Sequence, residues 1–232
     1  MLSVDPPRET SADAPPVLLR EVHELRLRLA EAYAAIDALR TDRASLEGDL
    51  RRLRRAASMD ALTGLWNRRF LLDSLNLSAA FALRHGLPLS LVLLDVDHFK
   101  AINDAHGHAT GDEALRDVAA ALQGATRDHD VVARFGGEEF AILLPGTDRD
   151  GATAMAERVR RGLEDRPWPV QTITASFGVA TIPSREKESA AVSLLLIESA
   201  DLALYHSKRQ GRNRVTHADE LLRPIEAVAA IE

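Results

Sequence analysis

A heptad pattern in the N-terminal part of the chain most narrows what this sequence can fold into. From Leu18 to Ala57 the residues of one seam are spaced alternately by four and three positions, and Arg43 is its only polar member. The pattern predicts one long helix with a narrow apolar stripe. A helix packed on its own domain is the alternative, but a narrow seam beside Arg and Glu favours a parallel coiled-coil dimer. The seam consists of Leu18, Val22, Leu25, Leu29, Ala32, Ile36, Leu39, Arg43, Leu46, Leu50, Leu53 and Ala57.

Composition bounds the class of protein. The chain has 232 residues, 46% hydrophobic and 28% charged, which suffices for one ordinary domain and an appendage. The absence of cysteine excludes disulfides and thiolate metal sites and fits a reducing cytoplasm. A net charge of -6 argues against a nucleic-acid partner. Because there is neither a long apolar run nor a hydrophobic leader, we expect no membrane association and a cytoplasmic location.

Changes in composition divide the chain into four parts. Pro, Ser and acidic residues predict a disordered lead-in over 1–15. The seam predicts a dimerising coiled-coil helix over 16–59. A mixed domain follows over 60–217, and a short tail closes the chain over 218–232.

Periodicity in the mixed domain predicts the order helix, strand, helix, hairpin, helix, strand, helix and a short last strand. We therefore expect an α/β (α+β) fold with one central sheet flanked by helices. Thr110 is expected to cap the helix that follows the first strand, and Gly211 to end the last helix. The segments are 88–97 and 172–181 for single strands, 131–145 for the hairpin, 110–126, 151–165 and 190–211 for helices, and 213–217 for the last strand.

Acidic side chains collect at two predicted strand ends. Asp95 and Asp97 alternate onto one face at the end of an apolar strand, and Glu138 and Glu139 follow two glycines at the bend of the hairpin, in the stretch RFGGEEF. Carboxylates at strand ends are suited to Mg²⁺, and glycines let a bulky ligand approach the backbone. A surface hairpin with solvated glutamates is the alternative for this motif taken alone.

Five motifs in fixed order resemble the GGDEF family of diguanylate cyclases across residues 60–217. They are DALTGLWNRR, LDVDHFKAINDAHGHATGDEAL, RFGGEEF, SFGVA and ADLALYHSKRQGRNRV. The resemblance implies a palm-like mixed sheet and an enzyme that joins two GTP molecules into cyclic di-GMP with loss of two pyrophosphates. It also implies a homodimer in which each domain holds one GTP with two Mg²⁺ ions, Mn²⁺ being possible in their place.

The resemblance assigns the catalytic centre residue by residue. Asp95 and Glu138 match the side-chain metal ligands, and the backbone carbonyl of Val96 completes the set. Glu139, the third catalytic residue, is a candidate to help deprotonate the ribose 3′-hydroxyl.

The same resemblance assigns the residues that bind the nucleotide. Asn103 and Asp112 match the guanine contacts, where a carboxylate can accept hydrogen bonds from a base edge that adenine lacks; turn formation and capping are the alternative roles. The turn at Phe99 and Lys100 matches the phosphate cradle. The remaining positions are Lys208 and Arg212 for the triphosphate, and Gly136 and Gly137 beneath the nucleotide.

The stretch RDHD, Arg127 to Asp130, matches the family's RxxD site for inhibition by the product. An arginine fork and a carboxylate both suit guanine edges. Arg158 is a candidate second arginine. A solvated turn is the alternative.

Two rival functions stay open. One is a catalytically silent GGDEF-like module that binds GTP or cyclic di-GMP and passes on a signal. The other is a different phosphoryl-transfer enzyme that makes a 3′,5′-cyclic monophosphate.

Overall fold

The computed structural model describes residues 16–169, 171–182 and 192–221, without the side chains of Pro16, Arg51 and Arg54. The chain divides into two compact units between Ala57 and Ser58. The predicted lead-in at 1–15 lies outside the described residues, as does 222–232 of the predicted tail. Across the described ranges, no helix has the length and apolar character that crossing a bilayer requires.

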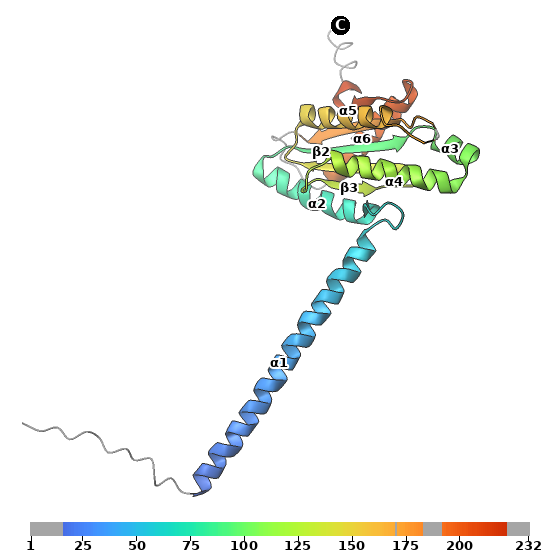
Figure 1. Ribbon diagram of the computed structural model, residues 1–232. Helices are drawn as coiled ribbons and strands as arrows, with labels where there is room; N and C mark the ends of the chain where they lie inside the picture. Colours follow the sequence, from blue (N-terminus) through green and yellow to red (C-terminus); the bar gives the residue numbers. More distant parts are fainter. Residues whose placement is uncertain (1–15, 170, 183–191, 222–232) are drawn as a thin grey trace, which may run out of the picture. The chain divides into compact units, whose positions relative to one another are not determined.

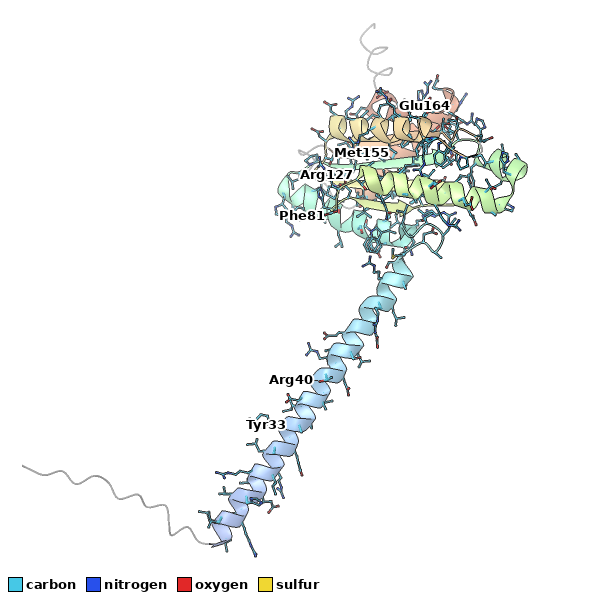
Figure 2. The ribbon with its side chains drawn as sticks, in the orientation of Figure 1. Tyr33, Arg40, Phe81, Arg127, Met155 and Glu164 are labelled. Atoms are coloured by element: carbon cyan, nitrogen blue, oxygen red, sulfur yellow. The ribbon has the colours of Figure 1, made fainter. Side chains whose placement is uncertain are left out.

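The N-terminal unit is one helix, α1 (Pro16–Ser58), of 43 residues. Leu, Arg, Glu and Ala, which are good helix formers, dominate it, and ion pairs such as Arg43–Glu47 at 2.8 Å link successive turns. Figure 2 shows side chains projecting all along it, Tyr33 and Arg40 among them. Within the single chain the seam is open to solvent, with Leu53 68% exposed. The predicted long helix is confirmed, and the apolar side chains of its seam are exposed.

The second unit is built on a six-stranded sheet with the order β1-β3-β4-β2-β5-β6 (Figure 1). The central strand β2 runs antiparallel to both of its neighbours, β4 and β5, while β1 is parallel to β3 and β6 is parallel to β5. The strands are β1 (Trp66–Asn67), β2 (Leu89–Val96), β3 (Val131–Arg134), β4 (Glu139–Pro145), β5 (Ala175–Ile182) and β6 (Val215–His217).

Helices cover both faces of this sheet, which explains why β2 is apolar without alternation. Its even-numbered side chains, such as Val92, pack with α3, α4 and α5, and its odd-numbered ones, such as Leu91, pack with α2 and α6. Figure 1 shows α4 and α5 lying along the sheet. The helices are α2 (Arg68–His85), α3 (Phe99–His106), α4 (His108–Ala125), α5 (Arg149–Glu164) and α6 (Val192–Arg209).

The predicted fold class, a mixed sheet flanked by helices and preceded by a long helix, is confirmed. The sequence reasoning missed α3, because its residues resemble a turn locally. It was also wrong about capping: α4 begins at His108, so Thr110 and Asp112 lie inside the helix, and the Thr110 hydroxyl donates to the carbonyl of His106 at 2.9 Å. Gly211 does follow the last helix, in left-handed backbone at φ 109°.

Candidate active site

The end of β2 brings the two acidic segments together. Antiparallel pairing places Asp95 directly opposite Glu139 of β4 on one side and Ser176 of β5 on the other. The Val96 N–H also donates to the carbonyl of Glu138 at 3.2 Å. Side chains directly opposite each other in an antiparallel pair share a face, so the carboxylates of Asp95 and Glu139 project on the same side of the sheet.

Asp95 is largely buried and pairs with a lysine from α6. The Lys208 ammonium lies 2.7 Å from its Oδ2 atom. Burial raises the pKa of Asp95 above its ordinary value, and the nearby charge of Asp97 acts in the same direction, while Lys208 and Arg212 oppose the rise. The carboxylate is therefore held in a site where its negative charge is costly and a positive partner is favourable.

Glu138 adds a second carboxylate to this site. Burial raises its pKa, and the charges of Asp95 and Glu139 raise it further, whereas Lys208 lowers it. Like charges are thus gathered around a single ammonium group. An excess of negative charge at the end of a strand suits a hard divalent cation. In the structure the Lys208 ammonium partly compensates this negative charge.

The carboxylates do not complete a metal cage by themselves. Among the described residues, no group of three or more His, Asp or Glu side chains is arranged to hold a metal ion. Two carboxylates and one backbone carbonyl would fit a cation that takes its other ligands from phosphate oxygens and water, as Mg²⁺ usually does. The residues present fit such an ion.

The two glycines of the bend differ in the space around them. A Cβ on Gly136 would collide with the Glu139 carboxylate, which lies over it, whereas the space around Gly137 is open. The carbonyl of Gly137 accepts hydrogen bonds from Arg134, at 3.0 Å from Nε and 2.6 Å from Nη2. The bend is therefore anchored by its own strand.

Arg134 also ties the bend to the start of the unit. Its Nη1 atom lies 3.2 Å from Asp60 Oδ1, and the Asp60 carboxylate also accepts from the backbone and the hydroxyl of Thr63. Burial acts to raise the pKa of Asp60, but the hydrogen bonds from Thr63 and Arg134 hold it below its ordinary value. Sequence reasoning did not find this pair, because no local pattern links positions so far apart.

The predicted guanine contacts lie where α3 and α4 approach each other. The Oδ1 atom of Asn103 is buried and has no hydrogen-bond partner in the part of the chain that the structure describes. A Cβ on Gly111 would collide with that atom, so the glycine leaves room for the Asn103 side chain in its present position. Asp112 follows Gly111 and is half-buried. An isolated glycine inside a helical pattern was the signal that could have singled out Gly111.

The predicted phosphate-binding residues come from two segments. Phe99 and Lys100 form the first turn of α3, where backbone N–H groups lack intrahelical partners; Phe99 is buried, and the Lys100 ammonium pairs with Asp104 at 2.9 Å. Arg212 lies in the turn after α6, close enough to Asp95 to lower the pKa of that carboxyl. The structure thus brings Lys208 and Arg212 to the carboxylates.

The RxxD stretch forms a tight turn between α4 and β3. The Arg127 N–H donates to Asp130 Oδ2 at 2.8 Å, and the Asp130 N–H donates back to the Arg127 carbonyl at 3.0 Å. Asp130 Oδ1 is buried without a hydrogen bond among the described residues. Arg158 of α5 donates from Nη2 to the carbonyl of Ala125 at 3.1 Å, which places it at the end of α4, near this turn.

Asp97 differs from the other acidic residues of the region. Its carboxylate is buried and accepts hydrogen bonds from Thr174, Ser176 and the backbone of Asn213. Its oxygens are therefore engaged within the protein, and it is not a further ligand for a cation.

Comparison with known proteins places these features in a family. Residues 57–214 match the family model described as "Diguanylate cyclase, GGDEF domain". The chain is 37% identical over 196 residues to the diguanylate cyclase DgcP of Pseudomonas aeruginosa, an alignment that covers 83% of this chain and 28% of that protein. The chain thus spans less than a third of the length of that relative.

Solved structures resemble both units. The crystal structure of the coiled coil and GGDEF domain of DgcB from Caulobacter crescentus, in complex with c-di-GMP, has a TM-score of 0.68 and 35% identity, and the match covers 83% of this chain and 98% of that one. The active GGEEF domain of a diguanylate cyclase from Vibrio cholerae has a TM-score of 0.61 and 36% identity, and the match covers 66% of this chain and 96% of that one.

Proposed function

The chain belongs to the GGDEF family of diguanylate cyclases. We propose that it condenses two molecules of GTP into cyclic di-GMP and two molecules of pyrophosphate. The observation that carries the proposal is the grouping of Asp95 and Glu138, whose pKa values are both raised, around the single ammonium of Lys208. Such a site favours the binding of a divalent cation together with the nucleotide phosphates that coordinate it.

The reaction is the attack of a ribose 3′-oxygen on the α-phosphorus of the other nucleotide, with pyrophosphate as the leaving group. Asp95, Glu138 and the Val96 carbonyl would hold Mg²⁺ or Mn²⁺, which neutralises charge on the phosphates. Glu139, whose carboxylate lies over Gly136, accepts the proton of the attacking hydroxyl. Most of the rate enhancement then comes from positioning and charge neutralisation.

The nucleotide is held at both of its ends. The buried, unpartnered oxygen of Asn103 accepts from the guanine base, and Asp112 accepts beside it. Lys208 and Arg212 bind the triphosphate. Lys208 gives up its contact with Asp95 to do so. The first turn of α3 supplies further backbone N–H groups to the phosphates. Gly136 and Gly137 keep the bend free of side chains where the nucleotide passes.

Two nucleotides require two domains. One unit of this chain offers a single set of these residues, so the active species is a homodimer in which two sites face each other. The exposed seam of α1 is the element that supplies the dimer.

Product inhibition belongs to the same proposal. The RxxD turn exposes Arg127, whose backbone N–H donates to the Asp130 carboxylate, and Arg158 lies nearby. Cyclic di-GMP bound there would keep the two domains apart without touching the GTP pocket, which makes the coupling allosteric.

The test is an incubation of the purified protein with GTP and Mg²⁺, followed by separation of the products by mass. The expected product is cyclic di-GMP, and Asp95→Asn should form none. GTP that is bound but unchanged would instead support a silent binding module. A 3′,5′-cyclic monophosphate would support a different cyclase.

A further inference from the structure

Left-handed backbone marks two turns at the edge of the site. Within the described residues, the only non-glycine residues with clearly positive φ are His98 at 57°, Arg212 at 62° and Asn213 at 45°. His98 lies between β2 and α3, and the other two lie between α6 and β6. Side chains with a Cβ make this conformation unfavourable, so it persists only where the surroundings hold it.

One buried carboxylate joins these two turns. Asp97, next to His98, is 5% exposed. Its Oδ2 atom accepts from the Asn213 N–H at 3.0 Å and from Thr174 Oγ1 at 2.8 Å, and its Oδ1 atom accepts from Ser176 Oγ at 2.7 Å. Charge-assisted hydrogen bonds of this kind are stronger than neutral ones, and here they fasten both turns to the start of β5.

A second set of contacts holds the side chain of Asn213. Its Oδ1 atom accepts from Arg160 Nη1 at 2.8 Å, and its Nδ2 atom donates to Glu164 Oε1 at 2.7 Å. Arg160 is itself oriented by Glu157, 2.8 Å from Nη2, and by Glu164, 2.7 Å from Nη1. Asn213 is therefore held through its backbone by Asp97, just after β2, and through its side chain by Arg160 and Glu164 of α5.

Arg212 immediately precedes the residue that is held in this way. Its N–H donates to the carbonyl of Ser207 at 3.0 Å, and its charge reaches Asp95. We propose that Asp97 and Arg160 are positioning residues that act through Asn213 to aim the Arg212 guanidinium at the triphosphate. This inference rests on the proposed function, in which Arg212 binds GTP. Asp97 touches neither substrate nor cation.

The first experiment is a double-mutant cycle of Asp97→Asn and Arg212→Ala, in which calorimetry measures the binding of a non-hydrolysable GTP analogue and of GMP. Asparagine keeps the shape of Asp97 but removes its charge. We expect Asp97→Asn to weaken binding of the GTP analogue about tenfold, the scale of one charge-assisted hydrogen bond, and to leave GMP affinity unchanged. In the Arg212→Ala background the same substitution should have no further effect, because the group it positions is gone.

A second pair of variants covers the case in which Asp97→Asn does not fold. Arg160 and Arg161 both pair with Glu157, at 2.8 Å and 2.9 Å, but only Arg160 contacts Asn213. Arg160→Gln should weaken binding of the GTP analogue in the wild-type background and not in the Arg212→Ala background. Arg161→Gln, the matched control, should leave it unchanged in both.

The outcomes separate this inference from the proposed function. If Arg212→Ala weakens binding of the GTP analogue and the other losses simply add to it, Asp97 and Arg160 do not act through Arg212, and the inference is overturned while the proposed function stands. If Arg212→Ala has no effect on binding, the inference fails together with the assignment of the triphosphate site. Equal losses for GTP analogue and GMP would also overturn the inference, because they would indicate a general disturbance of the fold.

Discussion

At the scale of one residue, Glu138 shows how a cation-binding site can lower the stability of the folded protein. Its carboxylate is partly buried beside Asp95 and Glu139, and burial together with these charges raises its pKa. The Lys208 ammonium pairs with Asp95 and only partly offsets the rise in the pKa of Glu138. The same charge that would attract a metal ion therefore costs stability when no ion is bound.

Replacing this carboxylate should abolish catalysis and keep the fold. We expect Glu138→Gln to lower the rate of cyclic di-GMP formation about 100-fold or more, since it removes charge from the proposed metal site. The rate is measured with GTP and Mg²⁺ by chromatography, and circular dichroism checks the fold. Glu198→Gln, at an exposed position of α6, is the control and should keep the wild-type rate. Wild-type turnover of Glu138→Gln would show that the metal site is wrongly assigned.

The same variant should be slightly more stable than the wild type when Mg²⁺ is absent. Because the pKa of Glu138 is raised in the folded state, its ionised form is a cost at neutral pH, and this cost disappears as the pH falls through the folded value. The carboxylate is only partly buried, so solvent screening limits the gain in free energy of unfolding to about 0.5 kcal/mol. Urea unfolding at neutral and acidic pH measures it, and a gain that grew in acid would contradict the explanation.

Arg127 tests the regulatory site without touching the catalytic one. We expect Arg127→Ala to weaken inhibition by added cyclic di-GMP about tenfold, because one charge-assisted contact to the product is lost, while the initial rate stays near wild type. The measurement is the initial rate over a range of product concentrations. Arg116→Ala, at an exposed position of α4, serves as the control. An unchanged inhibition curve for Arg127→Ala would remove the RxxD turn from the proposal.

At the scale of an element, the edge strand β6 depends on a buried histidine. His217 is 1% exposed; its Nδ1 atom accepts from the Asp219 N–H at 3.2 Å, and its Nε2 atom lies 3.1 Å from the Thr181 hydroxyl. Accepting at Nδ1 leaves the proton of the neutral ring on Nε2, where it can be donated to Thr181. Burial lowers the pKa of His217 below its ordinary value of 6.5, although the charges of Asp219 and Glu220 oppose this.

This geometry predicts a pH dependence of stability. Because the folded pKa is lowered, the unfolded chain takes up the proton first, so stability is lost as the pH falls from about 6.5 through the folded value. His217→Gln should be less stable than the wild type at neutral pH, but its stability should change less over this range. Thermal unfolding at a series of pH values measures both slopes. Parallel slopes would show that His217 does not control this response.

At the scale of the whole molecule, the prediction concerns the seam of α1. Leu29 belongs to the seam and Leu27 does not, yet the two are almost equally exposed in the single chain, at 54% and 53%. If the seam forms a coiled-coil dimer, Leu29→Asp should dissociate it and Leu27→Asp should not. Sedimentation measures the oligomeric state.

Activity should follow the oligomeric state. Leu29→Asp and deletion of residues 1–57 should both lower the rate of cyclic di-GMP formation and make it rise steeply with protein concentration, because two domains must then meet by diffusion. Leu27→Asp should behave like the wild type. A dimeric and fully active deletion variant at low concentration would show that another surface holds the dimer.

Most elements and the class of fold could be predicted from the sequence alone. Heptad spacing predicted α1, a continuous apolar run predicted β2, and two glycines between apolar runs predicted the hairpin of β3 and β4. These features depend on the geometry of neighbouring residues, so a short stretch suffices to read them. The helix α3 was not predicted, because its residues suit a turn as well as a helix. Burial of Phe99 and Ile102 in the folded domain favours the helix.

Contacts between distant groups could not be predicted from the sequence. Lys208 pairs with Asp95, Arg134 pairs with Asp60, and Asp97 accepts from Asn213. These contacts depend on the tertiary arrangement, in which β1 lies beside β3, and β2 lies between β4 and β5. Alternation along a strand determines the face of a side chain but not which strand or helix lies beside it. Packing of the whole sheet and its helices makes that choice, because it depends on burying both apolar faces at once.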